Sequence, residues 1–270
     1  MKPAARRPAT IAQPALLLRR FPFGESSLVL HVLTPDAGRV ALLAKGAYRP
    51  SSGYFAVFDL FDTLGVRWSA RTGQELGLVT RAELVTRRPG IASDLERYRA
   101  ALSLLELAHL SGREQHEERG LFAWLEGALD ELQRAVIAPR LVVLAADLAL
   151  LREHGLAPAL SACASCGARP SERERSVPFS AALGGRLCLA CATAERARGR
   201  AVEPIPLNAL RVAESLMDAT PAMLAHTHIE AGLLERVRAF VERFLEYHLE
   251  TRLRSRRSPT RKSCKASWSL

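Results

Sequence analysis

The sequence predicts an α+β protein in which a small five-stranded barrel precedes a helical domain that carries a cysteine-bearing insert. Three observations support this: short apolar runs between turn residues, then apolar residues at helical spacing, and two closely spaced cysteine pairs between helical segments. They indicate an N-terminal extension at 1–13, the barrel at 14–88 and the helical domain at 89–254. The insert occupies 160–195, and a basic flexible tail is expected at 255–270.

Apolar runs of strand length make up the predicted barrel. Between the second and third runs, Pro35-Asp36-Ala37-Gly38 has the composition of a tight turn. No segment of helix length separates the runs, and an open sheet of five strands would leave two exposed edges, so closure is expected. The strands are predicted at residues 15–21, 27–34, 39–45, 54–68 and 75–86.

Helical spacing of apolar residues begins after residue 90. Ser93 is the expected N-cap of a helix that runs to residue 111. Thr227 and Glu230 have the spacing of a capping box ahead of a long final helix. Pro139 suits a first helical turn and Gly155 a C-terminal cap. Three more helices are therefore predicted at residues 121–133, 139–155 and 207–218.

The formal net charge of +10 is unevenly distributed along the chain. Lys plus Arg minus Asp plus Glu is +7 for residues 1–90, −4 for 91–160, +4 for 161–200, −4 for 201–250 and +7 for 251–270. Such segregation favours a polyanion surface carried by particular modules, with nucleic acid the first candidate. The alternative is that the arginines only provide solubility.

Neither secretion nor membrane insertion is expected. The first thirteen residues contain no apolar core of a signal peptide. The longest apolar stretch, Leu141–Leu151, contains Asp147 and is too short to cross a bilayer. The sequence therefore predicts a soluble, cytoplasmic protein.

Four of the five cysteines form two CxxC pairs, Cys163 with Cys166 and Cys188 with Cys191. Two residues between thiolates let both sulfurs bind one ion, and two such pairs complete a tetrahedral Zn²⁺ site. Four thiolates leave no position open for water, so one structural zinc is predicted. Disulfides are the alternative, but a chain without a secretory signal is expected among reduced thiols. Cys264, in the tail, is expected to be a lone thiol.

No catalytic apparatus is evident, and no enzymatic activity is expected. Gly24-Glu25-Ser26 lacks the second glycine of a nucleophile elbow and is followed by a strand-like run. It also lacks the lysine and the following helix of a phosphate-binding loop. The seven histidines are scattered at spacings that match no metal or catalytic motif. The glycine and serines therefore predict a bend between two strands.

Basic and aromatic residues of the barrel are the predicted contacts with nucleic acid. Arginine and lysine side chains follow phosphates, and aromatic rings stack on bases without reading sequence. The tail adds basic residues, although a solubilising extension explains it equally well. The candidates in the barrel are Arg19, Arg20, Arg39, Lys45, Tyr48 and Arg49, and those in the tail are Arg256, Arg257, Arg261 and Lys262.

The segment "LLLRRFPFGESSLVLHVLTPDAGRVALLAKGAYRP", residues 16–50, resembles the start of the RecO family of bacterial recombination mediators. "ELGLVTRAELV", residues 75–85, is similar to the closing barrel strand of that family, and the helices with two CxxC pairs fit the remainder. The chain departs from the family after Lys45-Gly46-Ala47, where Tyr48-Arg49 stands in place of two adjacent basic residues.

The resemblance implies an OB-fold barrel and a protein that works without enzymatic turnover in DNA repair and recombination. It implies binding of single- and double-stranded DNA and annealing of complementary strands. It further implies action with RecR and the C-terminal tail of single-strand-binding protein, and indirectly with RecA. An RNA-binding OB-fold protein with a zinc ribbon remains the alternative.

Overall fold

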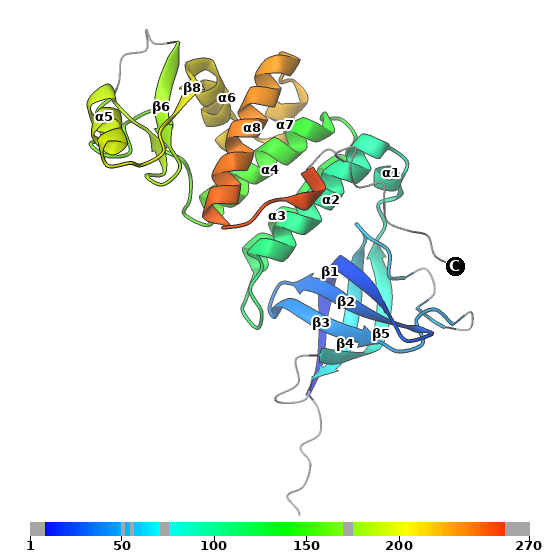
Figure 1. The fold of residues 1–270 in the computed structure, drawn as a ribbon. Helices are drawn as coiled ribbons and strands as arrows, with labels where there is room; N and C mark the ends of the chain where they lie inside the picture. Colours follow the sequence, from blue (N-terminus) through cyan, green and yellow to red (C-terminus); the bar gives the residue numbers. More distant parts are fainter. Residues whose placement is uncertain (1–8, 50–51, 55–56, 71–75, 170–174, 257–270) are drawn as a thin grey trace, which may run out of the picture.

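The structure, a computed structural model, describes residues 9–49, 52–54, 57–70, 76–169 and 175–256. Its N-terminal part is a closed five-stranded barrel in the order β1-β2-β3-β5-β4, with β4 pairing back onto β1 (Figure 1). All pairs are antiparallel except β3 with β5. This confirms the predicted barrel. The strands are β1 (Ala9–Phe23), β2 (Ser27–Thr34), β3 (Gly38–Ala44), β4 (Thr63–Ala70) and β5 (Leu76–Thr86).

Two strand boundaries differ from the prediction. β1 begins at Ala9, because residues 9–16 pair with β4, so the barrel starts within the predicted extension. β4 begins only at Thr63, and residues 57–62 form no strand. The reason lies at Phe61, whose φ of 75° is incompatible with an extended strand. Phe55, within the predicted fourth strand, lies outside the described residues.

The helical region contains four helices before the cysteine-bearing insert and three after it. The first long helix is capped by Asp94 and not by Ser93, which has αR backbone angles. The extended Asp94 accepts a hydrogen bond at 2.8 Å from the Arg97 N–H. These helices are α1 (Pro89–Ala92), α2 (Leu95–Ser111), α3 (Arg119–Arg134), α4 (Pro139–Glu153), α6 (Leu207–Met217), α7 (Pro221–Ala225) and α8 (Ala231–His248).

The predicted capping box at Thr227 is wrong. The Thr227 hydroxyl donates to the carbonyl of Met223 and so belongs to the end of α7. Glu230 itself caps α8, because its carboxylate accepts hydrogen bonds from the N–H groups of Gly232 and Leu233. The final helix therefore begins at Ala231, three residues later than the capping box would place it.

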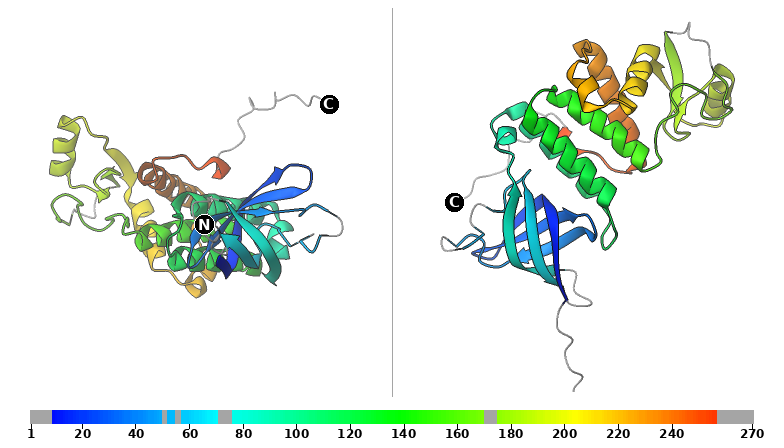
Figure 2. Two further views of the ribbon diagram at one scale, coloured as in Figure 1. Left: turned by 90° about the horizontal axis from the view of Figure 1, so that it is seen from below. Right: turned by 180° about the vertical axis from the view of Figure 1, so that it is seen from behind.

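The cysteine-bearing insert, here the cysteine module, follows α4 and lies at the far end of the helical region from the barrel (Figures 1 and 2). Its strands form a three-stranded sheet in the order β7-β6-β8. Phe179 of β6 packs edge-on against Phe240 and Phe244 of α8, with ring centroids 4.8 and 5.8 Å apart. The elements are β6 (Ser176–Ser180), β7 (Gly185–Arg186), α5 (Leu189–Ala197) and β8 (Glu203–Pro206).

One buried arginine joins the barrel to the helices. The side chain of Arg88 is 1% exposed and donates to the Phe61 carbonyl and the Thr63 hydroxyl. Its Nε donates at 2.7 Å to the carboxylate of Asp130 on α3. The Arg88 N–H also donates to the buried carboxylate of Asp62. The junction is thus held by a network of charged hydrogen bonds.

Candidate metal centre and nucleic-acid interface

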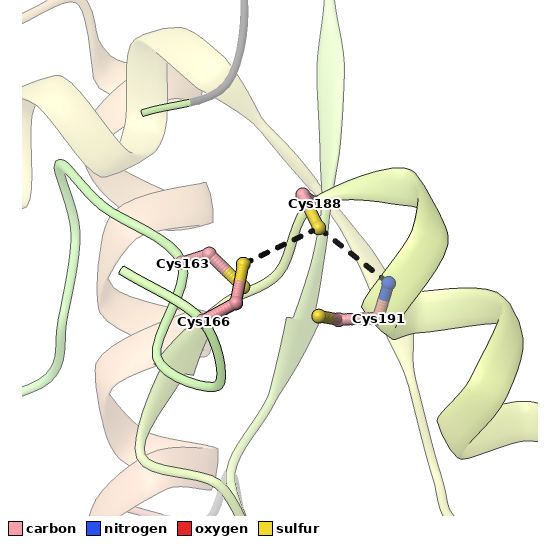
Figure 3. A group of neighbouring side chains, drawn as sticks. All are labelled: Cys163, Cys166, Cys188 and Cys191. Atoms are coloured by element: carbon pink, nitrogen blue, oxygen red, sulfur yellow. Dashed lines mark hydrogen bonds between the residues drawn. The ribbon is translucent and has the colours of Figure 1, made fainter. Parts of the chain in front are cut away.

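The four cysteines of the CxxC pairs converge on one point. Their sulfur atoms all lie within 4.8 Å of one another, and Cys166 Sγ is 3.8 Å from Cys188 Sγ (Figure 3). Cys163 and Cys166 lie in the turns that follow α4, where Gly167 adopts a φ of 71°. The other pair lies where α5 begins, with Cys188 as its N-cap.

Backbone N–H groups face these sulfurs. The Cys191 N–H donates to Cys188 Sγ at 3.5 Å (Figure 3). Burial raises the pKa of the Cys163 thiol, but N–H groups of Cys188, Cys166 and Ser165 overcome this and lower it to about 6. Hydrogen bonding of this kind favours a thiolate, which is the form that binds a metal.

The sulfur atoms also affect each other's ionisation. A hydrogen bond from Ser165 lowers the pKa of Cys191, but contacts with Cys188 and Cys166 outweigh it and raise that pKa to about 12. Four thiolates this close together repel one another, and a cation bound among them would offset that repulsion. Four convergent sulfurs, joined by no carboxylate or imidazole of the described residues, fit a closed tetrahedral site for a soft or borderline divalent metal.

A second candidate site lies on the outer face of β1, β2 and β3. Side chains two residues apart on a strand share a face, and so do directly paired residues. Arg19, Phe21 and Phe23 therefore share this face. Phe21 and Phe23 are 44% and 54% exposed, which is unusual for phenylalanine. Lys45 follows directly after β3 and is exposed.

The turn after β3 closes one end of this face. The Tyr48 N–H donates to the Ser26 carbonyl and the Gly46 N–H to the Ser27 hydroxyl, so the turn packs on the β1–β2 hairpin. Tyr48 is 50% exposed. We call the set Arg19, Phe21, Phe23, Lys45, Tyr48 and Arg49 the aromatic platform. Three exposed rings interleaved with three cations suit unpaired bases and their phosphates.

Two of the predicted barrel contacts have other partners. Arg20 donates to the Phe58 carbonyl at 2.6 Å and lies 3.7 Å from Asp59. Arg39 donates to the His109 carbonyl of α2 and pairs with Glu114 at 2.8 Å, so it joins barrel to helices. Arg39 thus contributes to the contact between barrel and helices, whereas the Arg20 side chain remains 43% exposed.

The prediction for Arg256 is wrong. Its side chain is 3% exposed and forms two hydrogen bonds, at 2.6 and 2.7 Å, with the buried carboxylate of Asp147 on α4. Residues 254–256 form a 3₁₀ turn, η1, so the predicted flexible tail does not start at 255. Buried Asp147, predicted only as an interruption of an apolar run, is the partner that the sequence does not reveal. Arg257, Arg261 and Lys262 lie outside the described residues.

Phe21 and Phe23 were missed from the sequence. Apolar residues in a strand are ordinarily assigned to the core. Alternation from Leu17, which is buried in the barrel core, would place Phe21 and Phe23 inside the barrel, and the register shift between Leu17 and Arg19 turns them outward.

The comparisons with known proteins agree along the whole described chain. Residues 9–88 match the family described as "Recombination protein O N terminal", and residues 92–257 match "Recombination protein O C terminal". A relative named DNA repair protein RecO, from Anaeromyxobacter sp. strain K, is 31% identical over 90% of this chain and 92% of its own length. Proteins of the same name from Streptomyces griseus and Rubrobacter xylanophilus are 31% and 32% identical, over 90% and 84% of this chain and 95% and 88% of theirs.

Proposed function

The chain belongs to the RecO family of DNA repair and recombination proteins, and we propose that it is a recombination mediator that binds and anneals DNA strands. In this role it binds single- and double-stranded DNA through the barrel. With RecR it helps to load RecA onto DNA coated by single-strand-binding protein, without enzymatic turnover of its own. The proposal places it in the cytoplasm, at the bacterial nucleoid.

The aromatic platform is the observation that carries the proposal. Annealing requires a surface that holds a strand of any sequence, so it must contact phosphates and base faces and leave base edges free. Three exposed rings and three cations on one barrel face meet that requirement. An RNA-binding protein would use the same chemistry, so the nucleic acid has to be decided by experiment.

The test is strand annealing on coated DNA. Two complementary, fluorescently labelled strands are saturated with single-strand-binding protein, and annealing is followed with and without RecR. We expect the protein to accelerate annealing and Phe23→Ala with Tyr48→Ala to remove most of that acceleration. Equal affinity for RNA together with no annealing of coated DNA would replace the proposal with the RNA-binding alternative.

A groove of about 450 Å³ between α2, α4 and α8 is the proposed site for the C-terminal tail of single-strand-binding protein. Arg99, Arg140 and Arg238 line it together with apolar Ala100 and Val143. It also contains Glu96 and Glu235, each paired with one of these arginines. The groove includes the N-terminus of α4, which attracts carboxylates. These features suit an acidic-apolar peptide.

Calorimetry with the tail peptide tests this site. Arg99→Glu should abolish the heat of binding, because it places a negative charge where the peptide carries its own. Arg243→Glu, on another face of α8, is the matched control and should leave the affinity unchanged. Equal weakening by both variants would show that the peptide responds only to overall charge.

We propose zinc as the metal of the cysteine module, because a closed four-thiolate site suits it and holds no position for a reacting ligand. Elemental analysis of protein purified without chelators should give close to one zinc per chain. Four titratable thiols and no metal would overturn this assignment.

A further inference from the structure

One end of the aromatic platform lies where β1 of the barrel meets α2. Phe21 of the platform packs edge-on against His31 of β2, with ring centroids 5.5 Å apart. His31 in turn stacks on His109 of α2, with centroids 5.4 Å apart and 19° between the ring planes. Rings from β1, β2 and α2 therefore form a continuous row across the junction of the barrel with the helices.

The two histidines of this row lack hydrogen-bond partners. Both residues are half-buried. In each ring Nδ1 is buried and has no hydrogen-bond partner in the part of the chain that the structure describes. A buried polar atom without a partner costs free energy. Phenylalanine at either position would fill the space without that cost, so packing alone does not account for the two imidazoles.

An unpaired cation lies beside the imidazoles. Arg19 is paired directly with His31 in the register of β1 and β2, so both side chains leave the same face of the sheet. The charge of Arg19 acts on both His31 and His109. Its guanidinium has no hydrogen bond or ion pair with any of the described residues. An anion bound to Arg19 therefore comes to lie beside both rings.

Other charged groups that face the two imidazoles come from β3, α2 and the segment after α2. Arg39 of β3 pairs with Glu114 at 2.8 Å. Glu106 of α2 accepts hydrogen bonds from the N–H groups of Arg254 and Ser255 in η1. Both carboxylates are thus already engaged by other groups. Arg19 is the cation of this cluster that is left for an external anion.

These surroundings keep both imidazoles neutral at pH 7 in the free protein. Burial, followed by the charges of Arg39 and Arg19, lowers the pKa of His31. Burial, followed by the charges of the same two arginines, lowers the pKa of His109 to about 4. The two carboxylates only partly oppose this. A phosphate paired with Arg19 offsets its charge and favours an imidazolium, so both pKa values rise when the phosphate binds.

We infer that Arg19, His31 and His109 form a site for one phosphate of a nucleic-acid strand, at which binding is coupled to uptake of a proton. The inference rests on the proposed function, because it assigns the end of the platform where the bound strand reaches α2. The proton comes from the solvent and stays on an imidazole nitrogen. Since binding favours protonation, protonation favours binding to the same extent, and the affinity rises as the pH falls.

The double variant His31→Phe with His109→Phe separates this site from packing, because it keeps the row of rings and removes the groups that titrate. Calorimetry with a strand of thymidine nucleotides, whose bases do not titrate near neutral pH, is carried out in two buffers of different ionisation enthalpy. At about pH 6 the unchanged protein should take up about half a proton per chain, which corresponds to roughly threefold tighter binding per unit of decreasing pH. The double variant should take up almost none.

Two further variants complete the experiment. His226→Phe removes an exposed histidine at the C-cap of α7 and should keep the full proton uptake. Arg19→Gln removes the cation that binds the phosphate and should lower both the affinity and the proton uptake. Thermal unfolding of each variant without nucleic acid shows that the fold is retained.

Three results would contradict the inference. Proton uptake that persists in the double variant would assign it to other groups. Binding by the unchanged protein without proton uptake would make the two histidines a packing contact between the barrel and α2. In both cases the proposed function stands, since the strand still binds. Absence of binding at every pH would instead contradict the proposed function and the inference together.

Discussion

The barrel and the cysteine module are stabilised by opposite means. The barrel encloses thirteen buried apolar residues, from Ala15 to Val79, inside a closed wall of paired strands. In the cluster around the cysteines only Cys163, Leu187 and Ala192 are buried. A cluster of that size cannot offset the conformational entropy of ordering the module. The barrel therefore folds on its apolar core, whereas we expect the module to depend on the metal proposed for its four cysteines.

The two regions are therefore expected to have separate roles: the cysteine module contributes to stability, and the aromatic platform of the barrel contacts nucleic acid. The four cysteines lie in a unit at the opposite end of the helices from the barrel, which carries the aromatic platform (Figure 1). Loss of the metal should leave the platform intact, and loss of the platform should leave the metal bound. Variants in one region therefore test this independence when both the metal content and the DNA affinity are measured.

The largest effect is expected from Cys163→Ser. Structural zinc sites of this class contribute about 10 kcal/mol or more to folding of the unit that holds them. The variant should lose its metal, and proteases should cleave between residues 160 and 200. Its affinity for single-stranded DNA should change less than twofold. Cys264→Ser removes a cysteine outside the cluster and should keep the full metal content. A large loss of DNA affinity in Cys163→Ser would mean that the two regions are coupled.

Arg88→Met should have the next largest effect, this time at the barrel. It removes the donors to the Phe61 carbonyl and the Thr63 hydroxyl and the partner of Asp130, while the backbone N–H that donates to Asp62 remains. Because a buried carbonyl and hydroxyl lose their donor, whereas Asp130 is partly exposed, we expect a cost of about 2–3 kcal/mol of unfolding free energy. Arg81→Met, in an exposed pair with Glu83, should cost less than about 1 kcal/mol. Chemical denaturation measures the loss of unfolding free energy in each variant. Equal losses would mean that Arg88 stabilises the protein no more than the exposed pair of Arg81 with Glu83 does.

The sequence predicted whatever depends on local pattern and missed whatever depends on distant partners. Strand alternation and two CxxC pairs are enough to predict the barrel and the four ligands. Arg256 resembles the rest of a basic tail, and only Asp147, 109 residues earlier, makes it a buried residue. Phe21 likewise resembles a core residue until the register of β1 turns it outward. Neither the burial of Arg256 nor the outward orientation of Phe21 can be predicted from the neighbouring residues.

The double variant Phe23→Ala with Tyr48→Ala tests the aromatic platform of the barrel. Each base that loses its stacking partner should cost about 1–3 kcal/mol of binding free energy, with little change in the salt slope, because no cation is removed. The metal content should stay constant. Tyr247→Ala, an exposed aromatic on α8, is the control and should bind DNA normally. Lower affinity in the control would mean that the strand also follows the helical region.

The smallest effect is expected from pH at the junction of the barrel with α2. The rings of His31 and His109 stack with centroids 5.4 Å apart. Desolvation by burial, followed by the charges of Arg19 and Arg39, lowers the pKa of His109 to about 4, while Glu106 opposes this. The same causes lower the pKa of His31, against Glu114.

Below pH 6.5 the unfolded chain therefore binds protons that the folded chain does not, and the free energy of unfolding falls as pH decreases toward about 4. Because His109 is only half-buried, we expect about 1–2 kcal/mol from it. His109→Phe keeps an apolar ring in the stack and should flatten this part of the stability curve, while exposed His116→Phe should not. The metal is measured at each pH, since protonation of thiolates also releases zinc. If the free energy of unfolding falls in parallel with the metal content in all variants, the pH dependence belongs to the cysteine module. The junction of the barrel with α2 would then be insensitive to acid.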